Sequence, residues 1–241
     1  MSDIHANLVA LEAVLEALES SPPVDEIWHL GDVVGYGPDP NGVVARLASL
    51  GAHGVRGNHD AAACGGPEIE WFNPEARQAI EWTRQAISET TRSWLAALPQ
   101  RSITGDFTLV HGSPLDPTWE YVTSAPVAAA NLAALASRND RHGLHGHTHV
   151  PAAWRVEGGR VAFTDPRHHP ILALDDRPAL LNPGSVGQPR DGDPRAAFAI
   201  LDTGAATIEW RRAGYDIPAV QAAMAAAGLP HWLITRLAAG H

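Results

Sequence analysis

Five short polar blocks in this chain consist mostly of side chains that can bind metal ions. They supply carboxylates, imidazoles and one amide, and no thiolate. This donor set suits Mn²⁺, Fe, Zn²⁺, Co²⁺ or Ni²⁺ and disfavours Cu(I) and iron–sulfur clusters. In chain order the blocks are Asp3-Ile4-His5, Gly31-Asp32, Gly57-Asn58-His59-Asp60, His111-Gly112 and Gly146-His147-Thr148-His149.

The number of candidate ligands indicates two ions rather than one. A single catalytic ion keeps an open position for water and needs fewer protein ligands than these blocks provide. Two ions about 3.5–4 Å apart that share one bridging carboxylate would use them all. The candidate ligands are Asp3, His5, Asp32, Asn58, His111, His147 and His149.

Each block also has a simpler structural explanation when it is taken alone. Asp3 could cap a helix, Asp32 could lie in a turn, and His111 could be a hydrogen-bonded interior histidine. His147 and His149 are stronger together, because alternate residues of an extended segment point the same way. All five blocks occur in one chain and most follow an apolar strand, which favours a shared site.

The elements that must position these blocks follow an α/β rhythm. Leucines at helical spacing predict a helix over 6–18, and a second helix is expected over 40–50. Short apolar strands at 26–30 and 53–56 end in polar residues, and ligands gather at the carboxyl ends of such strands. Further strands are expected at 107–110, 142–145, 152–156, 161–164, 171–174, 179–181, 196–202 and 207–212.

Residues 66–100 are predicted to form an inserted helical pair. Asn73-Pro74 is a helix cap followed by proline at the first helical position, and Ser88 can cap a second helix that ends before Pro99. Such a segment could cover the site and limit substrate size, or it could equally form a dimer surface. Two short helices are expected near the end of the chain, at 219–227 and 232–239.

Composition narrows the classes of function. The chain has 241 residues, of which 45% are hydrophobic and 18% charged, and no linker divides it, so one domain over 1–241 is expected. Its net charge of −10 disfavours nucleic acid and anionic membranes as partners. Cys64 is the only cysteine, which excludes an intrachain disulfide. The absence of a long apolar run or a signal-peptide pattern predicts a cytoplasmic protein, and a homo-oligomer is left open.

Read together, the blocks resemble the calcineurin-like metallophosphoesterase superfamily, whose D-x-H, GD, GNH, H and GHxH motifs are met at every ligand position. The resemblance runs from Asp3 to about Asp202. Segments 31–38 and 182–190 look most like those of the small bacterial phosphoesterases. Gly35-Tyr36-Gly37 and Asp60 stand where phosphoprotein phosphatases and diadenosine tetraphosphatases typically show GDxVDRG and GNHE, so the chain is expected outside those branches.

This resemblance implies a fold and a division of the ligands. The fold would be a four-layer α-β-β-α sandwich of two mixed sheets. Asp32 would bridge the two metals. The first metal would be held by Asp3, His5, Asp32 and His149, and the second by Asp32, Asn58, His111 and His147.

It also implies hydrolysis of a phosphodiester or phosphomonoester bond in a small-molecule or nucleotide substrate. Two divalent ions, with Mn²⁺ favoured, would lower the pKa of a bridging water so that hydroxide attacks phosphorus in line. His59 is the expected general acid for the leaving oxygen. Asp60 would either orient His59 or cap a helix or turn. Tyr36 and Arg190 are candidate substrate contacts.

The start of the chain departs from the family pattern. Family members place an apolar strand directly before D-x-H, whereas only Met1 and Ser2 precede Asp3 here. Either the assigned start lies downstream of the true one, or the chain does without that strand. The second case would leave a gap in sheet pairing and an α-amino group near the first metal. We expect the sheet order to show whether the neighbouring strands close up or another segment fills the place.

Two other functions compete with this prediction. A non-catalytic metal-binding scaffold of the same fold is disfavoured, because every ligand and the expected acid are present. A nuclease is disfavoured by the acidic balance, the short length and the lack of a basic stripe.

Overall fold

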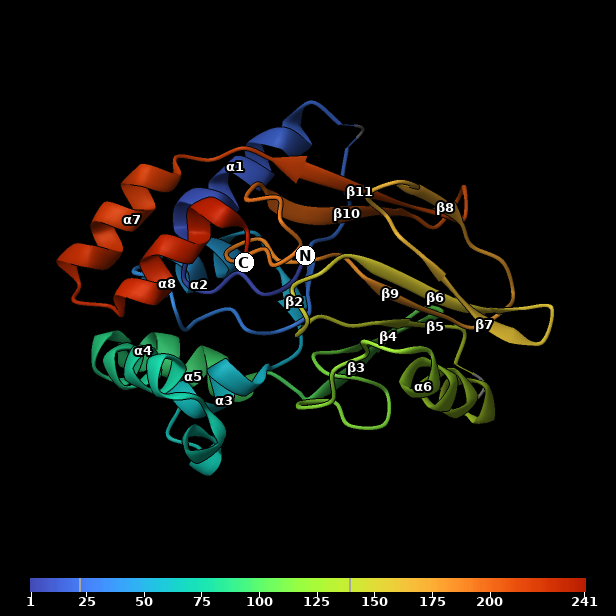
Figure 1. Ribbon diagram of the computed structural model, residues 1–241, viewed down its shortest axis with the longest axis horizontal. Helices are drawn as coiled ribbons and strands as arrows, with labels where there is room; N and C mark the ends of the chain where they lie inside the picture. Colours follow the sequence, from blue (N-terminus) through green and yellow to red (C-terminus); the bar gives the residue numbers. More distant parts are fainter. Residues whose placement is uncertain (22, 139) are drawn as a thin grey trace.

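Two facing β-sheets with helices on their outer sides make up the molecule (Figure 1). The computed structural model describes residues 1–21, 23–138 and 140–241. One sheet has six strands in the order β3-β4-β5-β9-β6-β7, and the other has three antiparallel strands in the order β10-β11-β8. In sheet order, the bounds are Arg101–Thr104, Phe107–Val110, His142–Leu144, Ala179–Asn182, Ala152–Glu157 and Arg160–Thr164, then Ala196–Asp202, Thr207–Ala213 and Ile171–Ala173.

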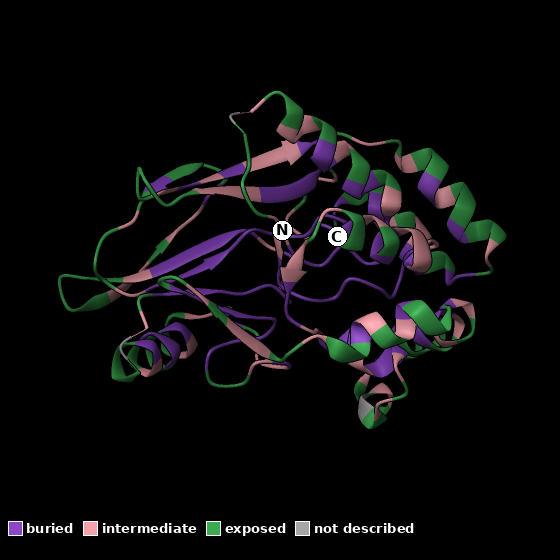
Figure 2. Cartoon of the chain, turned by 180° about the vertical axis from the view of Figure 1, so that it is seen from behind, coloured by how far each residue is buried: buried purple, intermediate pink, exposed green. Residues whose placement is uncertain are grey.

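The layers follow from which faces are apolar. Leu109 and Leu181 of the six-stranded sheet pack with Trp210 of β11 in a core between the sheets. Helix α6 (Ala125–Ser137) covers the outer face of the six-stranded sheet, and α1 (Leu8–Glu19) covers β10 and β11. Figure 2 shows the buried residues gathered along the strands and under the helices. The four-layer α-β-β-α prediction is therefore confirmed.

The predicted helical insertion is also present. Asn73 and Ser88 cap α4 (Pro74–Ala86) and α5 (Glu89–Ala97), accepting hydrogen bonds from the backbone N–H groups of Ala76 and Thr91. A 3₁₀ turn, η1 (Pro67–Trp71), precedes the pair. The remaining helices are α2 (Pro40–Ser49), α3 (Asn58–Ala63), α7 (Ile217–Ala226), α8 (His231–Arg236) and the 3₁₀ turn η2 (Leu237–Ala239). Within the described ranges, no helix combines the length and the apolar character needed to cross a membrane.

One of the two expected sheets is split into two parts. Strands β1 (Trp28–His29) and β2 (His53–Gly54) form a parallel pair that is separate from the three-stranded sheet. Residues 1–3 lie beside β1: the Met1 amino group donates to the Trp28 carbonyl at 2.9 Å, and the Leu30 N–H donates to the Met1 carbonyl at 3.1 Å. On their other side, the N–H groups of Val186 and Gly187 donate to Ser2 and Asp3. Burial lowers the pKa of the Met1 amino group to about 5.

The neighbouring strands have not closed up. A cavity of about 1070 Å³ separates the β1 segment from β10, and its lining includes Met1, Trp28, Phe107, Phe198 and Ile200. Neither facing edge is paired with another strand among the described residues. Among the described residues, residues 1–3 therefore occupy one end of the place expected for the first strand, and the rest of that place is a groove lined by apolar and charged side chains.

We predict that filling this groove stabilises the fold. A fused extension of about five alternating apolar residues before Met1 would continue the parallel pairing with β1 at roughly 3.3 Å per residue. Two newly buried aliphatic side chains at about 1.5–3 kcal/mol each should raise the thermal midpoint by at least about 6 °C. Calorimetry on the extended chain and on a control extension with a central proline measures this. Equal midpoints for the two extensions would contradict it.

Candidate metal centre

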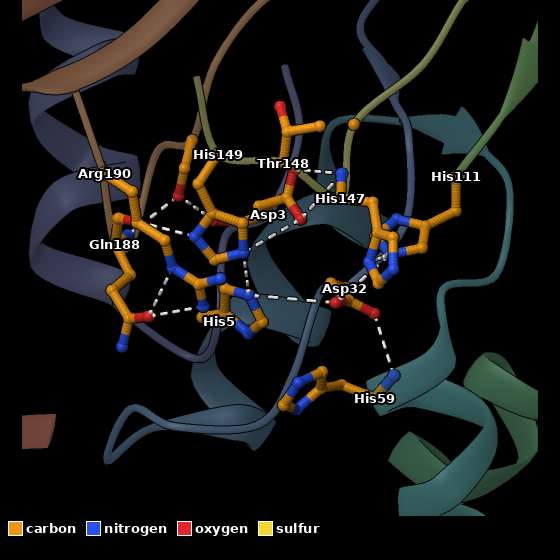
Figure 3. A network of polar contacts seen from close by, with 12 residues as sticks. Asp3, His5, Asp32, His59, His111, His147, Thr148, His149, Gln188 and Arg190 are labelled. Atoms are coloured by element: carbon orange, nitrogen blue, oxygen red, sulfur yellow. Dashed lines mark hydrogen bonds and ion pairs between the residues drawn. The ribbon is translucent and has the colours of Figure 1, made fainter. Parts of the chain in front are cut away.

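The candidate ligands come from loops that follow the central strands and meet at one place (Figure 3). Asp32 follows β1, Asn58 opens α3 just after β2, and His111 follows β4. His147 and His149 come after β5, while Asp3 and His5 come from the start of the chain. All seven side chains belong to residues that are at most 3% exposed.

Three residues form a first group of ligand atoms. His5 Nε2 lies 3.1 Å from His149 Nε2, and His149 Nε2 lies 3.3 Å from Asp3 Oδ1. A carboxylate oxygen and two imidazole nitrogens therefore lie close together, from two parts of the chain that are distant in the sequence.

A second group surrounds His111. Its Nε2 lies 2.9 Å from Asn58 Oδ1 and 3.0 Å from His147 Nδ1. The two groups share one atom: Asp32 Oδ2 is 3.3 Å from His111 Nε2 and 3.8 Å from His5 Nε2. Asp32 is thus placed as a carboxylate between the groups.

Backbone carbonyls set the tautomers of three imidazoles. The Nδ1 atoms of His5, His111 and His149 lie 3.3, 2.9 and 2.6 Å from the carbonyl oxygens of Val34, Leu30 and Gln188. Because a carbonyl can only accept, each Nδ1 must carry the proton. In the neutral imidazoles of His5 and His149, Nε2 then presents its lone pair to the site, and His111 Nε2 can do so once it has released its own proton.

Burial keeps most of these imidazoles neutral. It lowers the pKa of His5 and His149 well below the ordinary value and that of His147 to about 2. The neutral form is the one that binds metal ions. Burial likewise raises the pKa of Asp3 to about 6.

The Asp32–His111 pair is the exception. Burial by itself would raise the pKa of Asp32, but the neighbouring imidazoles of His111, His59 and His5 together outweigh this effect and hold the pKa well below its usual range. Burial by itself would lower the pKa of His111, but Asp32, with smaller contributions from Asp3 and the Leu30 carbonyl, raises it to about 9. A buried negative charge therefore persists between the two groups, where it attracts cations.

Strained backbone aims the ligands. Five of the seven candidates have φ between 50° and 65°, in the left-handed region that residues other than glycine rarely adopt. Each such residue costs about 1–3 kcal/mol, and this strain persists only where the surrounding structure imposes it. The five are Asp3, His5, Asp32, His147 and His149.

Two glycines of the sequence motifs allow this close approach. A Cβ on Gly57 would lie 2.0 Å from Asp32 Oδ1, and one on Gly146 would lie 1.9 Å from Ser2 Oγ. These two motif glycines are therefore required by space.

Asp60 contacts the backbone. Its carboxylate oxygens accept hydrogen bonds from the N–H groups of Val34 at 3.0 Å and Gly57 at 2.9 Å. These bonds tie the start of α3 to the loop that follows Asp32. Of the two roles expected for Asp60, this geometry favours the cap.

His59 lies beside the ligand groups. Its backbone N–H donates to Asp32 Oδ1 at 2.9 Å, and its ring packs 4.3 Å from Tyr36 and 4.6 Å from Phe72, measured between ring centroids. Its Nδ1 is buried and has no hydrogen-bond partner among the described residues. Burial lowers its pKa to about 4.

The 182–190 segment holds the ligand loops together. Asn182 Nδ2 donates to the Gly146 carbonyl at 2.8 Å and to Thr148 Oγ1 at 3.0 Å. Ser185 Oγ donates to the Asp3 carbonyl at 2.7 Å. This segment thus positions both ends of the first ligand group.

Arg190 and Tyr36 lie at one side of the site. The Arg190 guanidinium lies 5.8 Å from the Tyr36 ring centroid and donates to Gln188 Oε1. Arg236 from α8 also approaches Tyr36; burial and the nearby Arg190 lower its pKa to about 10. Arg190 has no carboxylate partner in the described part of the chain, whereas Arg236 donates to the backbone oxygen of His241. Arg236 was missed from the sequence because it lies beyond the motifs, in a helix that carries no site signature.

The residues present fit metal ions. The donors are carboxylate, amide and imidazole groups, and His147 Nε2 is buried without a partner in the described ranges. Fold and donor set together define a metal-binding α/β protein whose site lies where its central strands end.

Comparisons with known proteins specify the class. A family model for the calcineurin-like phosphoesterase superfamily domain matches residues 1–206. An uncharacterized protein of Methanocaldococcus jannaschii is 36% identical, covering 100% of this chain and 96% of that protein. The crystal structure of a metallophosphoesterase from Sphaerobacter thermophilus is 44% identical with a TM-score of 0.88, covering 100% of this chain and 98% of that one. The chain therefore belongs to the calcineurin-like phosphoesterase superfamily and is a phosphoric ester hydrolase.

One named relative is more distant. A symmetrical bis(5'-nucleosyl)-tetraphosphatase of Pectobacterium carotovorum is 32% identical. The match covers 57% of this chain and 50% of that enzyme. The chain is predicted to lie outside the tetraphosphatase branch, and it nevertheless resembles a member of that branch over part of its length.

We predict that divalent metal stabilises the protein through Asp32. Mn²⁺ at about 100 times its Kd adds roughly 2.7 kcal/mol to the free energy of unfolding, or about 5–10 °C in thermal midpoint. Asp32→Asn should lose most of this shift, because it removes the charge between the two groups. Asp175→Asn, at an exposed ion pair with Arg177, is the matched control. An equal Mn²⁺ shift in wild type and Asp32→Asn, measured by scanning fluorimetry, would refute the prediction.

Proposed function

We propose that the protein is a dinuclear metal-dependent phosphoesterase that hydrolyses small phosphate esters, including nucleotides. The observation that carries the proposal is the position of Asp32 Oδ2, within 3.8 Å of ligand nitrogens in both groups. A carboxylate in that position can bridge two cations, and paired cations suit in-line displacement at phosphorus.

Each group would hold one cation, with Asp32 common to both. When bound, two divalent ions supply hydroxide near neutral pH and neutralise phosphate charge. Mn²⁺ is the favoured ion among those that the donor set suits. The first group consists of Asp3, His5, Asp32 and His149, and the second of Asp32, Asn58, His111 and His147.

His59 would donate the proton to the leaving oxygen. It lies against the shared carboxylate, and its Nδ1 makes no hydrogen bond within the described residues. Because burial lowers its pKa to about 4, its protonated form depends on the negative charge of a bound phosphate ester. Asp60 would act as a positioning residue by fixing the start of α3.

Arg190 and Tyr36 would contact the substrate. An arginine without a carboxylate partner can bind phosphate oxygens bidentately, and Tyr36 contacts both Arg190 and His59. The name of the Pectobacterium relative supports a nucleotide-like ester as substrate, although only half of that enzyme is matched.

Hydrolysis of bis-p-nitrophenyl phosphate tests the proposal. We expect turnover that requires added Mn²⁺, Co²⁺, Zn²⁺ or Ni²⁺ and is lost with a chelator. His59→Ala should lower kcat by roughly 10²–10⁴ for substrates with poor leaving groups while metal content stays unchanged. His168→Ala, an exposed histidine, is the control.

Three results would count against this account. An unchanged rate of His59→Ala on a poor leaving group would remove His59 from proton transfer. No metal-dependent turnover on any phosphate ester would favour the non-catalytic scaffold, and cleavage of DNA in preference to small esters would favour the nuclease.

A further inference from the structure

Four aromatic side chains form a rim on the side of the site next to the helical insertion. Trp71 and Phe72 come from η1 and the residue after it, and Trp119 and Tyr121 come from the loop that follows His111. The ring centroids of Trp71 and Trp119 lie 5.1 Å apart, and those of Phe72 and Trp119 lie 5.6 Å apart. Two segments that are distant in the sequence thus meet through aromatic contacts.

This aromatic rim touches the site directly. Phe72 packs edge-on against His59 at 4.6 Å, and the Tyr121 ring stacks on His147 at 3.8 Å between centroids. Trp119 lies 6.3 Å from His147. The rim is therefore continuous with the expected proton donor and with one candidate metal ligand.

Its outer members are unusually open for their size. Trp71 is 71% exposed and Tyr121 is 48% exposed, while Trp119 is half-buried. Exposed aromatic surface beside a reaction site costs free energy unless something flat covers it. Rings of this kind stack on planar groups, and nucleobases are the commonest planar groups on phosphate esters.

Positive charge near the rim fits the same ligand. The Arg190 guanidinium lies 5.8 Å from the ring centroid of Tyr36, and Tyr36 in turn packs against His59, which Phe72 of the rim also contacts. A phosphate near Arg190 and the candidate metal ligands would leave an attached planar group within reach of Tyr121 and Trp119.

We propose that Trp71 and Trp119 form a stacking face for the planar base or aryl group of the substrate, and so select nucleotide-like esters. This rests on the proposed function, because it needs the phosphate to bind at the metal centre. In the competing explanation Trp71 has only a structural role, which is to pack η1 against the loop after β4.

Equilibrium binding separates the two explanations without relying on turnover. Non-hydrolysable phosphonate analogues of adenosine 5'-monophosphate and ribose 5-phosphate, named below by the parent esters, carry the same anionic group and differ in the base, so their Kd ratio on the Mn²⁺-loaded protein reports stacking. Wild type should bind the nucleotide at least about fivefold more tightly, since stacking of one base contributes roughly 5- to 150-fold.

Variants of Trp71 and Trp119 then assign the effect. Trp71→Leu and Trp119→Leu keep apolar contacts but remove the ring, and each should reduce the ratio severalfold while the Kd of ribose 5-phosphate stays the same. Trp71→Phe should recover part of the ratio. Phe163→Leu, at an exposed aromatic on β7, should change nothing. Thermal midpoints within about 2 °C of wild type confirm that each variant is folded.

Each remaining outcome overturns the inference. Equal Kd values for the two ligands in wild type, or an unchanged Kd ratio in both Leu variants, would leave only the structural packing role of Trp71. If neither ligand binds and bis-p-nitrophenyl phosphate is not hydrolysed, the proposed function is overturned and this inference with it. Equal binding with normal hydrolysis would overturn the stacking face alone.

Discussion

The site depends on one buried carboxylate. Asp32 is 1% exposed, one of its oxygens accepts the His59 backbone N–H, and the other faces both His5 and His111. A buried negative charge is costly unless positive charge or hydrogen bonds compensate it. The surrounding chain compensates this negative charge only in part, through one backbone N–H and one charged imidazole. Cations between the two groups would supply the rest.

The ligands around Asp32 are held by the fold rather than by one another. Carbonyl groups of Leu30, Val34 and Gln188 orient three imidazoles, and a run of left-handed residues turns the side chains inward. Strain at this many adjacent positions requires rigid support. That support comes from the loops after the central strands and from the 182–190 segment, which grips the Asp3 backbone.

Sequence reasoning could group candidate ligands for a physical reason, whereas the four layers were expected from the family resemblance. Polar residues after apolar strands must meet where parallel strands end, so Asp32, His111 and His147 could be grouped without coordinates. The orienting carbonyls carry no side-chain signature, because any residue has one. Trp71 and Trp119 are 48 positions apart, and their meeting depends on how the insertion packs. The tryptophans were therefore interpreted from sequence as scattered anchors.

The start of the chain shows the same limit. The sequence indicated that the apolar strand expected before Asp3 was in doubt, but only coordinates could show what occupies its place. Among the described residues, residues 1–3 occupy part of its place, and a groove of mixed apolar and charged lining between the β1 segment and β10 occupies the rest.

The most direct test of the account is anomalous diffraction from crystals grown with Mn²⁺. We predict two anomalous peaks per chain, about 3.5–4 Å apart, with Asp32 Oδ2 or both Asp32 oxygens between them. A single peak, or two peaks that do not share Asp32, would contradict the dinuclear centre on which the proposed chemistry depends.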